Sequence, residues 1–97
     1  MKYNIPDKVL KDICLFAKRR GVKKVLLFGS RARGTHTERS DIDIAVCGGD
    51  TLGLSFDLEE CSHTLLMFDV IDLDKSISDE LKHEIERDGV LIYEETR

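Results

Sequence analysis

The sequence predicts one small α/β domain, because short apolar runs of strand-like composition alternate along the chain with segments of helical periodicity. The chain has 97 residues, of which 41% are hydrophobic and 35% are charged. A chain of this length buries about 60% of its unfolded surface, which forms one core but not two lobes that enclose a substrate. No linker interrupts the alternation, and we therefore expect residues 1–97 to form a single domain.

The first half of the chain is expected to contain a helix, a strand and a helical turn. Apolar residues recur at helical spacing after Pro6, and Gly21 follows a basic last turn, which is typical of a helix end. Residues 22–28 form a β-rich stretch that stops at Gly29. Residues 30–34 suit a short helical turn before a polar loop.

The second half is expected to alternate strands with helices. Gly48 and Gly49 break the chain after a strand whose residues alternate in polarity. The expected elements are, in order, a strand over 41–46, a helix over 54–62, a strand over 67–73, an amphipathic helix over 78–88 and an edge strand over 90–93. The predicted order of the whole chain is αβ(α)βαβαβ, where the parentheses mark the short helical turn.

Composition argues against a membrane or a secreted protein. The longest aliphatic or aromatic runs, residues 25–28 and 65–68, are far shorter than the roughly 18 residues that a membrane span needs. Charged residues interrupt the apolar ones near the start, so no signal peptide is indicated and a cytoplasmic location is expected. Because the cysteines are odd in number and widely spaced, we expect reduced packing residues rather than disulfides or a zinc site. They are Cys14, Cys47 and Cys61.

Charge is distributed unevenly along the chain. The first forty residues carry eleven Lys or Arg and three acidic residues, whereas the remainder carries four and sixteen. Basic blocks of this kind usually form solvated helix ends and turns, and the alternative is that they face a triphosphate or an acidic partner. A nucleic-acid partner is disfavoured, because few aromatic residues are available for stacking and the second half is strongly acidic.

Residues 28–34 place a glycine and a serine where a strand meets the start of a helix. Exposed N–H groups and the helix dipole attract a phosphate there, Gly29 lets it approach the backbone, and the Ser30 hydroxyl adds a donor. Arg31 and Arg33 follow, and they either bind phosphate or pair with surface acids. A Gly-Ser pair also occurs in ordinary turns, so this signal needs a second one.

The second signal comes ten residues after Ser30. Asp41 and Asp43 lie two positions apart on a predicted strand, so their side chains share one face about 7 Å apart. Two like charges on one face repel each other unless a cation neutralises them. Mg²⁺ binds carboxylates together with phosphate oxygens, and two such ions would stabilise the attacking and leaving oxygens of phosphoryl transfer. The alternative is a solvated acidic strand face.

The strand over 67–73 supplies two candidates for a third carboxylate, and they point to opposite faces. Asp69 lies within an apolar run, where an unpaired charge would be costly, whereas Asp72 lies near the end of the strand. We therefore choose Asp69 as the third metal ligand and expect it to help take the proton from an acceptor hydroxyl. The alternative is that Asp69 makes a local hydrogen bond and Asp72 begins a turn.

The combined motif resembles that of the polymerase β-type nucleotidyltransferase superfamily, and in particular its minimal nucleotidyltransferases (MNT). Its members are Gly29-Ser30, Asp41, Asp43 and Asp69, and the resemblance covers residues 22–93. It implies a mixed sheet with helices packed mainly on one face, ATP or another nucleoside triphosphate as substrate, and three carboxylates as catalytic Mg²⁺ ligands. Many MNT proteins act with a helical HEPN-type partner, commonly as the antitoxin that adenylylates it. The resemblance therefore implies transfer of AMP or another nucleotide to a partner protein.

The small size of the domain predicts a partner, because aligning an acceptor hydroxyl with a triphosphate needs additional surface. We expect a separate helical protein or a second copy of this chain. The resemblance to the MNT antitoxins implies that the helical protein is of the HEPN type and that the acceptor is a Tyr hydroxyl rather than that of Ser or Thr. The apolar residues expected to engage the partner lie near the chain ends and are Ile5, Leu91, Ile92 and Tyr93. In the alternatives, these residues close the core, the chain binds nucleotide without catalysis, or it modifies a small molecule such as an aminoglycoside.

The histidines and the polar loop have no catalytic role in this interpretation. His36, His63 and His83 lack metal-ligand spacing and are expected at the surface. Residues 35–40 form a loop that is expected to border the nucleotide, and the alternative is a plain connection.

Overall fold

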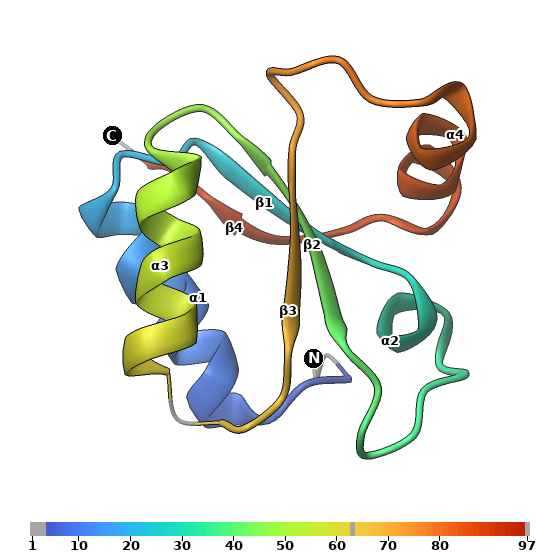
Figure 1. Cartoon of the computed structure of the whole chain (residues 1–97), viewed down its shortest axis with the longest axis horizontal. Helices are drawn as coiled ribbons and strands as arrows, with labels where there is room; N and C mark the ends of the chain where they lie inside the picture. The colour runs from blue at the N-terminus through green and yellow to red at the C-terminus, as the bar shows by residue number, and fades with distance from the viewer. Residues whose placement is uncertain (1–3, 63, 97) are drawn as a thin grey trace.

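The computed structural model describes residues 4–62 and 64–96, and it contains the elements in the predicted order (Figure 1). Their bounds are α1 Asp7–Arg19, β1 Lys24–Phe28, α2 Ser30–Arg33, β2 Ile42–Cys47, α3 Thr51–Cys61, β3 Phe68–Asp72, α4 Asp79–Asp88 and β4 Val90–Glu94. Helix α3 begins earlier than expected, because the Asp50 side chain accepts a hydrogen bond of 2.9 Å from the Gly53 amide and caps the helix before its first buried residue.

The four strands form one mixed sheet in the order β3-β2-β1-β4. Strand β1 is antiparallel to both β2 and β4, whereas β2 and β3 run parallel. A parallel pair needs a crossover connection, and α3 supplies it between β2 and β3. The mixed sheet implied by the sequence resemblance is therefore confirmed, with β3 and β4 at its edges.

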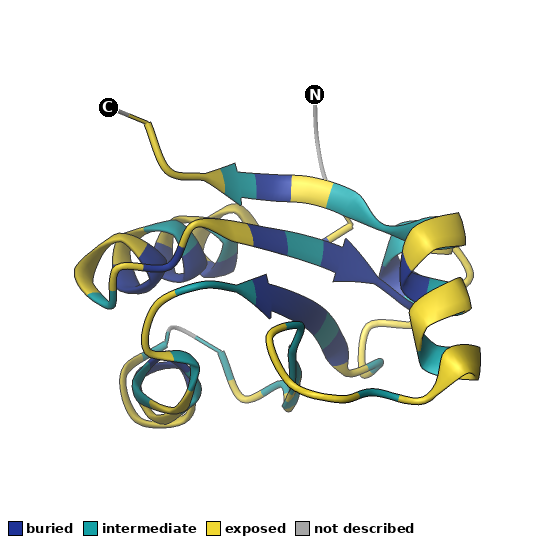
Figure 2. Cartoon of the chain, turned by 90° about the horizontal axis from the view of Figure 1, so that it is seen from above, coloured by how far each residue is buried: buried dark blue, intermediate teal, exposed yellow. Residues whose placement is uncertain are grey.

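Helices α1 and α3 cover one face of the sheet and enclose the main core (Figure 1). Alternate side chains of β2 point into this core, and Ile42, Ile44 and Val46 are fully buried. Helix α1 adds Val9, Ile13 and Phe16 from one stripe, and α3 adds Leu54 and Leu58. In Figure 2 the buried segments lie along the inner strands and on the sides of these helices that face them.

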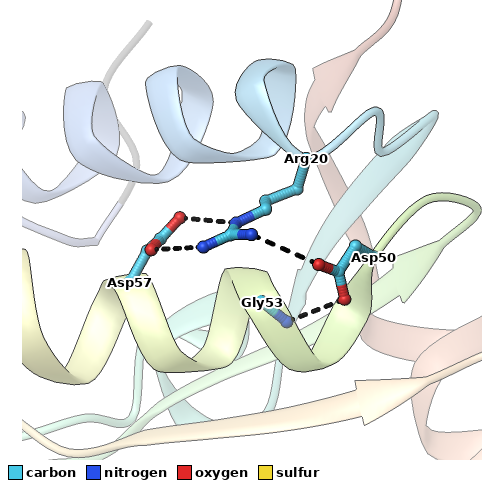
Figure 3. Close-up of polar contacts among 4 residues, drawn as sticks. All are labelled: Arg20, Asp50, Gly53 and Asp57. Atoms are coloured by element: carbon cyan, nitrogen blue, oxygen red, sulfur yellow. Dashed lines mark hydrogen bonds and ion pairs between the residues drawn. The ribbon is translucent and has the colours of Figure 1, made fainter.

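An arginine joins the two helices of this layer (Figure 3). Arg20, which follows α1, donates from Nε and Nη2 to the two carboxylate oxygens of Asp57 on α3, both at 2.9 Å. Its Nη1 donates to Asp50 at 3.3 Å, so the residue that caps α3 belongs to the same cluster. The Asp57 side chain is only 6% exposed, and a bidentate guanidinium satisfies a buried carboxylate well.

Helix α4 packs on the opposite face and covers only part of it. Ile85 of α4 is buried against Phe28 and Ala45 in a second, smaller cluster. Most other residues of α4 are exposed or half-buried, as Figure 2 shows for the helix at its right. The face that carries α4 also carries the alternate β2 residue Asp43, so the candidate site lies on this side of the sheet.

The structure corrects the expectation that apolar residues near the chain ends engage a partner. Ile5 is 7% and Ile92 is 8% exposed, and both belong to the main core. Tyr93 also packs against that core, while Leu91 is 41% exposed. The reason is that β4 pairs with β1 and turns Ile92 toward α1. Ile5, Ile92 and Tyr93 therefore close the fold, which was the alternative interpretation, whereas Leu91 remains exposed.

The structure also bears on what was expected of membrane spans, cysteines and histidines. None of the helices in residues 4–62 and 64–96 has both the length and the apolar character to cross a membrane. Cys14, Cys47 and Cys61 are free thiols. His83 is exposed and His36 is half-buried, whereas His63 lies outside the described residues.

Candidate active site

The glycine-serine turn lies directly against one of the predicted aspartates. Gly29 has φ +74°, a conformation that side chains other than glycine rarely adopt, and α2 begins at the next residue. A Cβ atom at Gly29 would lie 2.2 Å from Oδ2 of Asp43. Glycine is therefore required here both by the backbone conformation and by the approach of the carboxylate.

Strand register brings Asp43 and Asp69 side by side. Asp43 pairs with Phe28 on β1 and with Asp69 on the parallel strand β3, so the two aspartates lie on the same face. Asp43 is half-buried, whereas Asp69 and Asp41 are exposed. Asp69 is exposed because β3 is an edge strand, and not buried in apolar surroundings as its sequence neighbours suggested.

The other third-strand candidate takes a different role. Asp72 pairs with Val46, a core-facing residue, and so lies on the opposite face from Asp69. Its Oδ1 accepts a hydrogen bond of 2.9 Å from the Asp74 amide and so begins the turn after β3. The structure thus brings Asp69, and not Asp72, next to Asp43.

The electrostatic surroundings of Asp43 favour its protonated form. Burial, and after it the nearby charges of Asp69, Asp41 and Glu84, raise the pKa of Asp43 to about 6, while the charge of Arg33 acts in the opposite direction. Several carboxylates thus face one another with incomplete compensation, which is the arrangement that a divalent cation relieves. Perturbed carboxylates at such a position are candidates for function.

The donor set fits Mg²⁺ as a cofactor that substrate oxygens help to bind. Within the described ranges, no group of three or more His, Cys, Asp or Glu side chains is placed to hold a metal ion by itself, so Asp41, Asp43 and Asp69 do not form a preassembled metal site. Mg²⁺ commonly uses one or two carboxylates and completes its shell with phosphate oxygens and water. The hard oxygen donors of Asp41, Asp43 and Asp69 suit this mode of binding.

Arg33 lies between α4 and the aspartates. Its Nη1 contacts Asp88 at 3.1 Å and Glu84 at 3.7 Å, and its charge lowers the pKa of Asp43. The two acidic residues of α4 were not identified from the sequence, since they reach the site only through the packing of that helix on the sheet. They hold the guanidinium beside the site, where it could turn to a phosphate.

The guanidinium of Arg31 is not placed for the expected contact with a phosphate. Arg31 is only 4% exposed, and its guanidinium donates to main-chain carbonyls of Asn4 and of the loop before β2. Both arginines follow the same glycine-serine turn and look alike in the sequence. Only the three-dimensional structure separates them, because the carbonyls come from distant parts of the chain.

A shallow pocket adjoins Asp41. It has a volume of about 440 Å³ and is lined by Asp41, Arg39 and the apolar residues 65–67. Leu65 is fully exposed and Met67 is 68% exposed, so an apolar rim lies next to the acidic residues. This rim is available to a group that approaches the site from outside.

Fold and site together define the class of this chain as a nucleotidyltransferase-type domain, because a mixed sheet presents neighbouring aspartates beside a glycine-serine turn. The comparison with known families agrees. The chain belongs to the "Polymerase beta, Nucleotidyltransferase" family, whose sequence profile matches residues 11–97.

Individual relatives are more specific. A protein of Methanocaldococcus jannaschii, named "Putative protein adenylyltransferase MJ0604", is 43% identical over 68 residues, which are 67% of this chain and 66% of the relative. The chain thus spans about two thirds of that protein. A crystal structure of a toxin-antitoxin with AMP-PNP is similar with a TM-score of 0.71 and 26% identity, and covers 90% of this chain and 74% of that chain. A crystal structure of a mutant of the MntA-HpeT toxin-antitoxin is similar with a TM-score of 0.69 and 26% identity, and it also covers 90% of this chain and 74% of that chain.

Proposed function

We propose that this chain is a Mg²⁺-dependent nucleotidyltransferase that transfers AMP from ATP to a hydroxyl group of a partner protein. The observation that carries the proposal is the in-register pair Asp43 and Asp69 beside Gly29, where no side chain separates the turn from the carboxylate. The names of the relatives, one a protein adenylyltransferase and one a toxin-antitoxin with AMP-PNP, support the choice of nucleotide and acceptor.

In this proposal the site residues have different roles, which follow from their positions. Asp41, Asp43 and Asp69 hold Mg²⁺, which when bound neutralises phosphate charge and polarises the phosphorus–oxygen bonds. Gly29 and Ser30 receive the phosphates at the turn, and Arg33 turns from the α4 carboxylates to contact them. Arg31 is not assigned to this set, because its guanidinium already donates hydrogen bonds to carbonyl oxygens.

The transfer step follows from this arrangement. The acceptor oxygen attacks the α-phosphorus, the bond from that phosphorus to the bridging oxygen breaks, and pyrophosphate leaves. The exposed carboxylate of Asp69 lies at the open edge of the sheet, where it accepts the proton of the acceptor hydroxyl.

A partner supplies the acceptor in this proposal. The chain is small, and the site opens at the surface beside the apolar residues Leu65 and Met67. We propose that the partner, a HEPN-type helical protein, covers these two side chains and presents a Tyr hydroxyl to the site. We propose this surface as the partner contact in place of the residues near the chain ends, because Ile5 and Ile92 are buried in the core.

Intact mass spectrometry tests the proposal. The chain is incubated with Mg²⁺, each nucleoside triphosphate in turn and the protein encoded by the neighbouring gene. We expect the partner to gain the mass of AMP with ATP, and to gain none with EDTA or with the Asp43→Asn variant. Binding of ATP without any mass gain would show a nucleotide-binding subunit instead. Mass gain by a free small alcohol but not by the partner would show a small-molecule enzyme.

A matched pair of variants tests the partner surface. Leu65→Ser together with Met67→Ser is expected to weaken association with the partner while ATP binding stays unchanged, because the serines remove only exposed apolar area. Leu52→Ser is the control, since Leu52 is also exposed, at 78%, but lies on α3 outside the pocket. Equal weakening by the control would reject the assignment of the surface.

A further inference from the structure

We propose that Arg31 is a positioning residue that holds the loop of residues 35–40 in place. This loop leads directly into Asp41 and then into the strand that carries Asp43, and the inference rests on the proposed function. Arg31 directly follows Ser30, and Asp41 directly follows the loop. One buried guanidinium thereby fixes the position of the metal-binding aspartates relative to the phosphate-binding turn.

The contacts of the guanidinium all go to main-chain oxygens. Nε donates to the Ser40 carbonyl at 3.0 Å, and Nη1 donates to the Asn4 carbonyl at 2.7 Å. Nη2 donates to the carbonyls of Thr37 at 3.3 Å and Glu38 at 3.2 Å. The middle and the C-terminal end of the loop, together with the segment before α1, are therefore bonded to one side chain.

The segment before α1 takes part in the same cluster. The amide group of Asn4 donates back to the Arg31 carbonyl, so the two residues hold each other. The adjoining Ile5 is buried in the main core, and this burial anchors the segment. The loop is thus tied through Arg31 to the core and not only to its own neighbours.

Besides the guanidinium contacts, the loop is held at its start by the Thr35 amide, which donates to the Ser30 carbonyl at 3.0 Å, and by hydrogen bonds within its own turn. Within it, the Ser40 hydroxyl accepts from the Thr37 amide at 2.9 Å, and the Ser40 amide donates to the Thr37 carbonyl at 3.1 Å. These bonds close one turn but do not attach it to the sheet. Residues 37–39 are exposed, so removal of the guanidinium would leave their carbonyls to water and free the loop to move.

The shape of the guanidinium distinguishes positioning from phosphate binding. An arginine has a planar fork of five donors, whereas a lysine concentrates its donors at one point and keeps the positive charge. A phosphate contact at this position would tolerate Arg31→Lys in part. A fork that reaches several carbonyls would not, so Arg31→Lys and Arg31→Met should behave alike.

Proteolysis without nucleotide is the first measurement. The protease Glu-C cleaves after Glu38, whose carbonyl accepts one of the Arg31 hydrogen bonds. We expect both variants to be cleaved there on the order of tenfold faster than the parent chain, because a lost charged hydrogen bond opens the loop. Arg19→Met is the control, since Arg19 is exposed on α1, and it should leave the rate unchanged. Unchanged cleavage after Glu38 in folded Arg31→Lys would overturn the proposal.

Transfer kinetics form the second measurement. Misplaced aspartates should lower kcat roughly tenfold in Arg31→Lys, while KM for ATP changes by less than about twofold. A rise in KM alone, with kcat retained, would show a phosphate contact. If the chain transfers no nucleotide at all, the proposed function fails, yet the proteolysis result still decides the role of Arg31.

Nuclear magnetic resonance of the unaltered chain covers the case in which the variants do not fold. The Nε–H of Arg31 is expected to exchange slowly with water before ATP is added and to keep its chemical shift afterwards. The Nε–H of Arg33 should shift on ATP addition. An Arg31 signal that exchanges rapidly in the free chain and becomes protected only with ATP would overturn the proposal.

Discussion

Two groups of aspartates lie on opposite sides of the sheet and have opposite electrostatic surroundings. Between α1 and α3, hydrogen bonds from Arg20 hold the pKa of Asp57 below its ordinary value. On the other face, burial and neighbouring carboxylates raise the pKa of Asp43 to about 6. The same residue type is therefore stabilised as an anion in one place and destabilised as an anion in the other.

The difference indicates what each group is for. The chain supplies its own cation to Asp57, whose side chain is almost fully covered, and the pair joins two helices. Among the residues that the structure describes, the cation that lowers the pKa of Asp43 is Arg33, which also contacts two carboxylates of α4. Uncompensated charge is unfavourable for folding, and such a site is typical of a place that an external cation or substrate completes.

The largest expected effect is on transfer activity. Asp41→Asn and Asp43→Asn should each lower the transfer rate roughly a hundredfold, which corresponds to about 3 kcal/mol of transition-state stabilisation. The melting temperature of Asp43→Asn should stay the same or rise, because a partly buried and crowded charge is removed. Rates of AMP transfer and thermal unfolding measure the two quantities. Full activity in both variants would reject the metal-ligand assignment.

A smaller effect separates the two aspartates of β3. Asp69→Asn should lower transfer by about tenfold or more, since Asp69 pairs in register with Asp43 and is proposed to accept the proton of the acceptor hydroxyl. Asp72→Asn should leave transfer within about twofold, because Asp72 serves the following turn. Steady-state rates of the two purified variants make the comparison, and the reverse order would place the third carboxylate on the other face.

The dependence on pH should be smaller still, and its direction follows from the raised pKa of Asp43. Folding raises this pKa from 3.8 to about 6, so the folded chain binds the proton more tightly than the unfolded chain does. The resulting stabilisation is complete below pH 3.8 and is lost as the pH rises to about 6. Mg²⁺ competes with that proton, so it should raise the melting temperature more at pH 7 than at pH 5. Asp43→Asn should abolish this difference, and a Mg²⁺ effect independent of pH in the parent chain would contradict it.

The smallest expected effect on activity lies in the other aspartate group. Asp57→Asn removes the buried carboxylate that accepts two hydrogen bonds from the half-buried Arg20 and should lower the melting temperature by roughly 5 °C or more. Transfer by the remaining folded chain should be unchanged, because Asp57 lies across the sheet from the site. Circular dichroism and transfer rates on the same sample measure both. Loss of transfer without loss of stability would break the separation between the two groups.

The sequence predicted the parts of the structure that depend on local spacing. Strand alternation correctly placed Asp69 and Asp72 on opposite faces, and glycine at position 29 correctly marked the end of β1. The register agrees with the choice of Asp69 beside Asp43, although the apolar surroundings on which that choice rested are not found. The sequence could not distinguish Arg31 from Arg33, since their partners lie on the segment before α1 and on α4. For the same reason it placed Ile92 at a partner surface, although pairing of β4 with β1 turns this residue into the core.

The contact between Gly29 and Asp43 also bears on how such a chain can change during evolution. A Cβ at Gly29 would clash with the carboxylate of Asp43, so a side chain at position 29 would displace that carboxylate from its place beside the turn. The backbone of Gly29, with φ +74° and ψ −157°, also lies in a region that is essentially restricted to glycine. Substitutions at the two positions are therefore coupled. A relative with a side chain in the turn is expected to have a displaced or substituted residue at the position of Asp43.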